Sequence, residues 1–109
     1  MSEERRGLRL PFDGVAEVFL ESSPGAAVAA RVTELSLRGC FLEISGSFKE
    51  QQRVQVKIFA SGQYFESPAD VIYVRPNGIG VTFEDIKPHL RSVLQKWILK
   101  ALDSQAGHS

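Results

Sequence analysis

Six short runs of β-forming residues, separated by turn sequences, constrain the fold of this chain more than any other feature. The clearest run, Arg53 to Phe59, alternates apolar with polar residues, as a strand with one buried face does. Turn sequences such as Glu21-Ser22-Ser23-Pro24-Gly25 separate the runs. The predicted strands are Val15–Leu20, Ala27–Leu35, Gly39–Ile44, Arg53–Phe59, Tyr64–Val74 and Gly80–Phe83. Short strands at regular spacing favour a small antiparallel barrel or sandwich.

The end of the chain follows a helical period instead. From about Pro88 to Leu102, apolar residues recur at the spacing of an amphipathic helix, and Pro88 suits a first helical turn. Trp97 lies in the middle of the apolar stripe, so we expect it to pack onto the strands. The sequence predicts an all-β domain over residues 14–102 that closes with one helix. A mobile leader over residues 1–13 precedes this domain, and a frayed tail over residues 103–109 follows it.

Length and composition exclude several classes of protein. The 109 residues suffice for one domain, and 43% of them are hydrophobic. Thirteen basic residues balance thirteen acidic ones, which argues against binding to a nucleic-acid polymer. The single cysteine excludes a disulfide framework and a cysteine-based zinc site. Because the chain has neither a long apolar stretch nor a secretory signal, we expect a cytoplasmic protein without membrane insertion.

No residue set in the sequence resembles an enzyme's active site. His89 and His108 lack neighbours that would form a metal site or a nucleophile–base pair. Cys40 falls inside a predicted strand, where a small buried thiol is the simplest interpretation. We therefore predict no catalytic residues, no metal and no cofactor.

Two polar segments have more specific potential. The first, Arg5-Arg6-Gly7-Leu8-Arg9, is either a solvated tail or a clasp for a small anion, because arginine binds phosphate oxygens and the guanine edge bidentately. The second runs from Glu34 to Gly39, between two predicted strands. By itself, it reads as a strand connection in which Ser36 bonds to the local backbone and Gly39 relieves the turn.

Together with the strand pattern, these segments resemble the PilZ family of small bacterial β-barrel domains. The similarity runs from about Glu4 to Leu102 and includes Arg5-x-x-x-Arg9, the Glu34-x-Ser36-x-x-Gly39 segment and the closing Gly80-Val81-Thr82-Phe83 strand. It implies a six-stranded antiparallel barrel with a C-terminal helix that binds the second messenger cyclic di-GMP. The family has Asp or Asn where this chain has Glu34, whose carboxylate reaches about 1.5 Å further.

The resemblance also implies roles for individual residues. Arg5 and Arg9 would contact guanine edges and phosphates, and Arg6 would add a phosphate contact. Ser36 and Gly39 match the family's second motif, with Gly39 letting the ligand approach the backbone. The nucleotide would order the leader across the barrel and so change the surface that a downstream protein meets.

Two alternatives and one open question accompany this interpretation. The chain is alternatively a PilZ-like domain that has lost nucleotide binding and serves protein interaction. An oligonucleotide-binding barrel would need basic and aromatic residues along one face. Here the aromatic residues are spread through apolar strands, and we expect them to pack: Phe19, Phe41, Phe59, Tyr64, Phe65, Tyr73 and Phe83. The sequence leaves a homodimer open.

Overall fold

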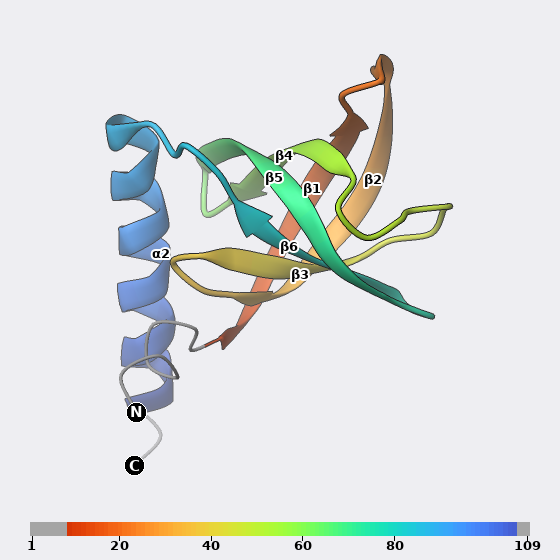
Figure 1. The fold of residues 1–109 in the computed structure, drawn as a ribbon. Coiled ribbons are helices and arrows are strands. Elements are labelled where there is room, and N and C mark those ends of the chain that lie inside the picture. The colour runs from red at the N-terminus through yellow and green to blue at the C-terminus, as the bar shows by residue number, and fades with distance from the viewer. Residues whose placement is uncertain (1–8, 107–109) are drawn as a thin grey trace.

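Six antiparallel strands close into a barrel in the computed structural model, which describes residues 9–106 (Figure 1). Neighbouring strands follow the order β1-β2-β3-β6-β5-β4 around the barrel. A single helix, α2, follows the last strand. The elements are β1 (Leu10–Leu20), β2 (Ser23–Leu35), β3 (Gly39–Glu43), β4 (Arg53–Ala60), β5 (Gln63–Arg75), β6 (Gly78–Phe83) and α2 (Pro88–Ala106).

The barrel interior is filled by the apolar side chains of the alternating strands. In β4, Val54, Val56 and Ile58 are fully buried, whereas the residues between them are at least partly accessible. Phe65 of β5 is also fully buried and is one of the largest side chains in the core. The period of two that predicted these strands therefore directs their apolar residues inward.

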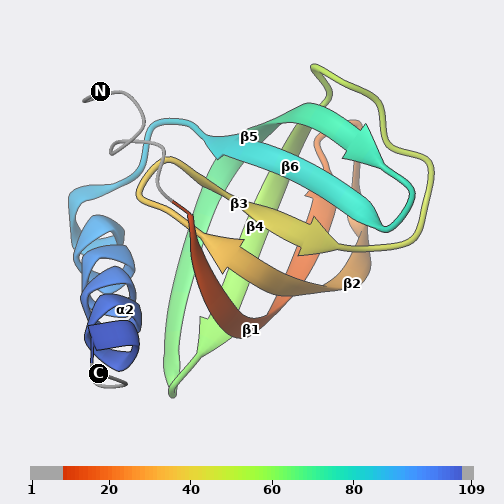
Figure 2. The same ribbon diagram turned by 90° about the horizontal axis from the view of Figure 1, so that it is seen from below.

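Helix α2 lies beside the barrel and contacts it mainly through β5 and β1 (Figure 2). Its buried residues are Leu90, Leu94 and Trp97. The Trp97 ring lies between two aromatic rings of the strands, with centroid distances of 5.5 Å to Phe12 and 6.4 Å to Phe65. The expectation that Trp97 packs onto the strands is confirmed.

The folded domain extends beyond its predicted boundaries at both ends. Residues 10–13, which the sequence assigned to the leader, belong to β1, because Leu10 is buried in the core and Phe12 packs on Trp97. Helix α2 continues to Ala106, so residues 103–106 are helical where fraying was expected. The remaining leader and tail residues, 1–8 and 107–109, lie outside the described part of the chain. No described helix is long and apolar enough to cross a membrane.

A register shift in β5 determines which way its second half faces. Val71 is fully buried and pairs with Val81, yet the next partner of β6, Gly80, pairs with Tyr73. Ile72 is the extra residue of this β-bulge and is 45% exposed. Because a bulge shifts the alternation by one residue, Tyr73 stands on the outer face of the barrel rather than in its core.

Candidate functional site

Four residues form a row across the outer face of four adjacent strands. Glu34 of β2 pairs with Phe41 of β3, Phe41 pairs with Gly80 of β6, and Gly80 pairs with Tyr73 of β5. A Cβ atom at Gly80 would lie 2.3 to 2.8 Å from three atoms of the Tyr73 ring. Glycine is therefore the residue that lets this ring lie over β6. The Phe41 and Tyr73 rings stack with their centroids 6.3 Å apart and their planes at 22°.

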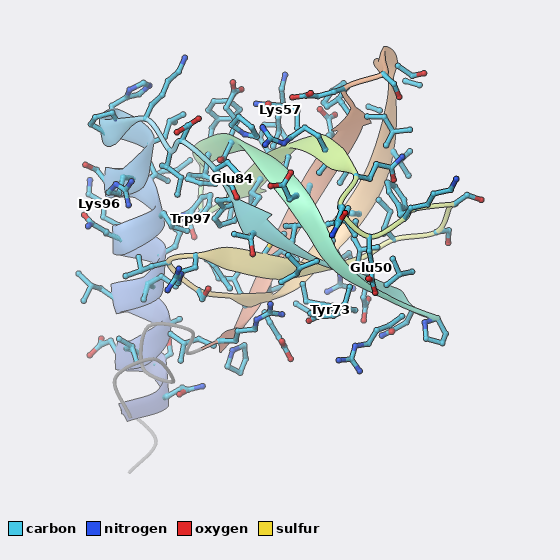
Figure 3. The ribbon with its side chains drawn as sticks, viewed as in Figure 1. Glu50, Lys57, Tyr73, Glu84, Lys96 and Trp97 are labelled. Carbon is cyan, nitrogen blue, oxygen red and sulfur yellow. The ribbon has the colours of Figure 1, made fainter. Side chains whose placement is uncertain are left out.

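Arg9 links this row to the arginine-rich end of the chain. Its Nη1 donates a 2.7 Å hydrogen bond to the Tyr73 hydroxyl and lies 3.7 Å from Glu34 Oε1. Its guanidinium carbon is 5.5 Å from the Tyr73 ring centroid, and that of Arg75 is 4.6 Å from the same centroid. Two cations thus flank one aromatic ring at cation–π distance. We call the surface formed by Arg9, Glu34, Phe41, Gly80, Tyr73 and Arg75 the Tyr73 face; Figure 3 marks the position of Tyr73.

A cleft of about 400 Å³ lies on the Tyr73 face. Its lining combines the rings of Phe41 and Tyr73 with the Arg75 guanidinium and the carboxylates of Glu34 and Glu43. This volume is within the range of small-molecule sites, roughly 300 to 1,000 Å³. Aromatic faces offer stacking, and arginine forks offer paired hydrogen bonds to phosphate or a purine edge. Such a lining suits a planar ligand that carries hydrogen-bond donors for the two carboxylates and an acceptor for the guanidinium.

Ser36 organises the turn that follows β2. Its side-chain oxygen accepts hydrogen bonds of 3.1 Å from the backbone N–H groups of Arg38 and Gly39 and donates one of 3.2 Å to the Gly39 carbonyl. The Ser36 N–H donates to the same carbonyl at 2.9 Å. Ser36 is only 3% exposed. The local bonding that the sequence suggested for Ser36 is present, and it engages the hydroxyl within the turn.

Gly39 is required where β3 meets β6. A Cβ atom at this position would lie 2.0 Å from the Val81 carbonyl oxygen, so no larger residue fits without moving a strand. The next residue, Cys40, is completely buried, and burial raises the pKa of its thiol to about 12, against a smaller lowering by the nearby Arg9 charge. The close packing of β3 on β6 thus explains why position 39 is a glycine. The approach of a ligand to the backbone at Gly39 stays a prediction.

The structure brings together some of the predicted site residues. Arg9 and Glu34 meet on the Tyr73 face, and Ser36 and Gly39 form the turn that follows the strand of Glu34. Arg5 and Arg6 lie outside the described residues. In the part of the chain that the structure describes, no three His, Cys, Asp or Glu side chains group as metal ligands would.

Sequence reasoning missed the aromatic part of the site. Tyr73 was expected to pack among the apolar strands, but the bulge turns it to the outer face, where its ring stacks on Phe41. Phe59 and Tyr64 are each 38% exposed and pack on one another with ring centroids 5.6 Å apart, whereas Phe41, Phe65 and Phe83 are buried. The overlooked signal is Gly78-Ile79-Gly80, because two glycines at alternate positions leave one face of a strand bare.

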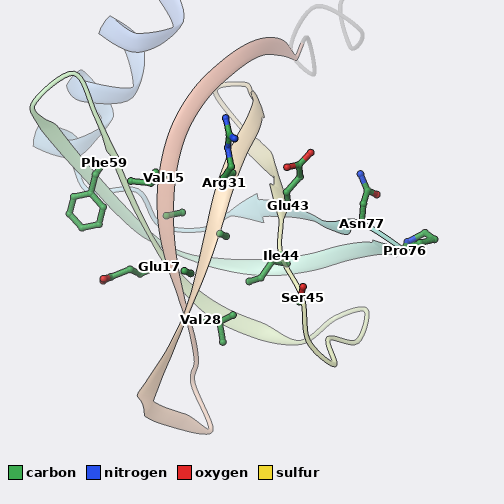
Figure 4. A pocket seen from close by; sticks show the side chains of 13 residues that line it. Val15, Glu17, Val28, Arg31, Glu43, Ile44, Ser45, Phe59, Pro76 and Asn77 are labelled. Atoms are coloured by element: carbon green, nitrogen blue, oxygen red, sulfur yellow. The ribbon is translucent and has the colours of Figure 1, made fainter.

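A larger cavity, of about 890 Å³, opens elsewhere on the barrel (Figure 4). Its apolar lining includes Val15, Val28 and Phe59. Its one arginine, Arg31, donates a 3.1 Å hydrogen bond to Asp13. None of the predicted site residues lines this cavity, so the Tyr73 face is the stronger candidate.

Comparisons with known proteins agree with this architecture. The family model of the PilZ domain matches residues 3–100 of this sequence. The chain therefore belongs to the PilZ domain family. No curated protein matches the sequence at a significant level. The predicted fold, a six-stranded PilZ-type barrel with a C-terminal helix, is therefore confirmed.

Several solved structures share the fold. The PilZ domain of YcgR from Escherichia coli, solved with c-di-GMP, has a TM-score of 0.73 and 15% identity over 93% of each chain. YcgR in complex with c-di-GMP has a TM-score of 0.71 and 19% identity, covering 93% of this chain and 46% of that one. The Bacillus subtilis inhibitor of motility, MotI/DgrA, has a TM-score of 0.69 and 15% identity, covering 88% of this chain and 50% of that one.

Proposed function

We propose that this chain is a receptor for cyclic di-GMP and binds the nucleotide on the Tyr73 face. The observation that carries the proposal is the meeting of Arg9 and Glu34, from two separate sequence motifs, beside one aromatic ring. The nucleotide complexes of YcgR support the choice of ligand, because YcgR shares the barrel. The proposed activity is binding, without a catalytic step.

The side chains of the Tyr73 face match the chemistry of this ligand. Arg9 supplies a planar fork for phosphate oxygens or the O6/N7 edge of guanine, and the family resemblance gives the same role to Arg5 and Arg6, which lie outside the described residues. Tyr73 offers a ring on which a guanine base stacks, an interaction worth about 1–3 kcal/mol per base. Glu34 supplies acceptor oxygens for the donor groups of guanine. A base that stacks on Tyr73 displaces one of the two guanidinium groups that flank the ring.

Relay of the signal follows from the position of the arginines before β1. The residues before β1 close over the bound nucleotide, and each residue that the nucleotide orders costs roughly 1–2 kcal/mol, which keeps the affinity moderate. The closed leader presents a new surface to a downstream protein or to a second copy of this chain.

One observation favours a second function, that of a PilZ domain which binds protein and no nucleotide. Glu34 stands where the family has Asp or Asn, and it contacts Arg9 within the fold itself. Tyr73 accepts a further hydrogen bond from the same arginine. An arginine with two partners in the fold has less to gain from a nucleotide.

Isothermal titration of cyclic di-GMP into the full chain separates the two functions. The receptor predicts saturable binding that is lost in an Arg5→Ala/Arg9→Ala variant. An Arg91→Ala variant is the matched control, because Arg91 is an exposed arginine of α2 outside the Tyr73 face. A folded native protein that gives no binding heat at high ligand concentration contradicts the receptor and leaves the protein-binding function.

A further inference from the structure

A second row of residues crosses the barrel beside the row that contains Tyr73. Glu43 of β3 pairs with Arg31 of β2 on one side and with Gly78 of β6 on the other. Gly78 in turn pairs with Arg75 of β5. Glu43 and Arg75 therefore stand on either side of a position without a side chain, and both line the cleft of about 400 Å³ on the Tyr73 face.

The Glu43 carboxylate has acceptor oxygens to spare. Its side chain is exposed and stands outward from β3 (Figure 4), and no described cation forms an ion pair with it. Arg31, its cross-strand neighbour, instead donates a 3.1 Å hydrogen bond to Asp13. The other carboxylate of the cleft, on Glu34, lies 3.7 Å from Arg9 Nη1. Of the two carboxylates, Glu43 is thus the one that a ligand can engage without competing with a described cation.

A carboxylate matches the hydrogen-bond donors of guanine. The Watson–Crick edge of this base presents N1–H and the 2-amino group side by side, and the two oxygens of a carboxylate accept from both. Adenine has a lone pair at N1, which a carboxylate repels. Hypoxanthine, the base of inosine, keeps N1–H and O6 but lacks the 2-amino group. A carboxylate at the base edge therefore distinguishes guanine from both other purines, which stacking alone does not do.

The rows of the barrel place Glu43 beside the position of a stacked base. The guanidinium carbon of Arg75 is 4.6 Å from the centroid of the Tyr73 ring. A base that takes the place of Arg75 over this ring would lie in the cleft, because Arg75 lines it. Gly78 and Glu43 belong to the adjacent row, so the edge of such a base would extend over Gly78 toward the Glu43 carboxylate.

We propose that Glu43 makes the Tyr73 face selective for guanine. This inference rests on the proposed binding of cyclic di-GMP and adds the residue that recognises one of its bases. The Glu43 carboxylate accepts hydrogen bonds from N1–H and from the 2-amino group, and the bare position at Gly78 lets the base edge approach. Glu43 belongs neither to the arginine segment before β1 nor to the segment from Glu34 to Gly39.

Calorimetric titrations with cyclic di-GMP and with its inosine counterpart test this inference on the full chain. The two nucleotides differ only in the 2-amino groups. We expect the native chain to bind cyclic di-GMP about tenfold tighter or more, because only guanine makes the second charge-assisted hydrogen bond. Glu43→Gln should abolish this preference, since an amide has one acceptor oxygen in place of two. The ratio of the two affinities is the readout, because the loss of a negative charge changes the binding of both anionic nucleotides by the same factor.

Cyclic di-AMP provides a gain that misfolding cannot produce. A glutamine amide can donate to adenine N1 and accept from the 6-amino group. Glu43→Gln should therefore shift the preference between cyclic di-GMP and cyclic di-AMP toward the adenine nucleotide by about tenfold or more. Glu17→Gln is the matched control, because Glu17 is an exposed glutamate of β1 that lines only the larger cavity, and it should leave every ratio unchanged.

The outcomes separate this inference from the receptor function. Equal affinities of the native chain for cyclic di-GMP and its inosine counterpart overturn the inference, and so does a preference that survives Glu43→Gln. Both results leave the receptor function standing. If the folded native chain binds none of these nucleotides, the receptor function and the inference are overturned together.

Discussion

Replacing Gly80 by alanine tests whether the Tyr73 ring can lie over β6 only because residue 80 has no side chain. The added Cβ would lie 2.3 to 2.8 Å from three ring atoms, so the ring must leave its position over β6. Its departure breaks the 2.7 Å hydrogen bond from Arg9 and the stack on Phe41. Overpacking costs about 1–3 kcal/mol, and an aromatic pair contributes roughly 0.5–1.5 kcal/mol. We expect Gly80→Ala to lower the free energy of unfolding by about 2 kcal/mol.

Gly80→Ala should raise the free energy of unfolding, rather than lower it, once the Tyr73 ring has been removed. In a Tyr73→Ala background nothing opposes the new methyl group, and alanine is more stable than glycine within a strand by about 0.5–1 kcal/mol. Urea unfolding followed by Trp97 fluorescence measures all four variants of this double-mutant cycle. A coupling free energy of about 3 kcal/mol is expected. If Gly80→Ala changes stability equally in both backgrounds, the reasoning is refuted.

Three further predictions follow from single residues. Ser36→Ala should lower the free energy of unfolding by about 1–3 kcal/mol, because the Arg38 and Gly39 N–H groups lose their acceptor; an unchanged urea midpoint contradicts this. Glu34→Asp should tighten cyclic di-GMP binding about fivefold or more in a calorimetric titration, since the shorter side chain matches the family and releases Arg9; weaker binding opposes the receptor account. The pKa of Cys40 is raised from 9.0 to about 12, so the unfolded chain loses this proton first, and stability should fall as pH rises from 9 toward 12. Urea unfolding at pH 8 and pH 10 should show this loss relative to Cys40→Ala, and equal losses in both proteins count against it.

The number of strands and their order along the chain could be predicted from the sequence because the signals are local. The alternation of Val54, Val56 and Ile58 depends on neighbouring residues alone, and the stripe around Trp97 depends on one helical period. The start of β1 at Leu10 could not be read in this way. Leu10 pairs with Leu35 of β2, and Phe12 packs on Trp97 of α2 at the other end of the chain, so both contacts depend on residues distant in sequence.

The site was only half predictable for a related reason. Arg9, Glu34, Ser36 and Gly39 stand in motifs with fixed spacing, so a resemblance was enough to single them out. Tyr73 reaches the outer face because of the bulge at Ile72, and no alternation rule contains that shift. Arg75 lies on the same strand as Tyr73, but Arg9 and Phe41 come from two other segments of the chain, which only the closed barrel brings to the ring.

The central claim is that cyclic di-GMP binds over the Tyr73 face, and an NMR titration tests it most directly. The account predicts that the nucleotide shifts the ring signals of Tyr73 and Phe41 and the backbone amide of Gly80, in a saturable way. Val15 and Phe59, which line the larger cavity, should remain unchanged. Saturable shifts that cluster at Val15 and Phe59 while Tyr73 and Gly80 stay still would contradict the account.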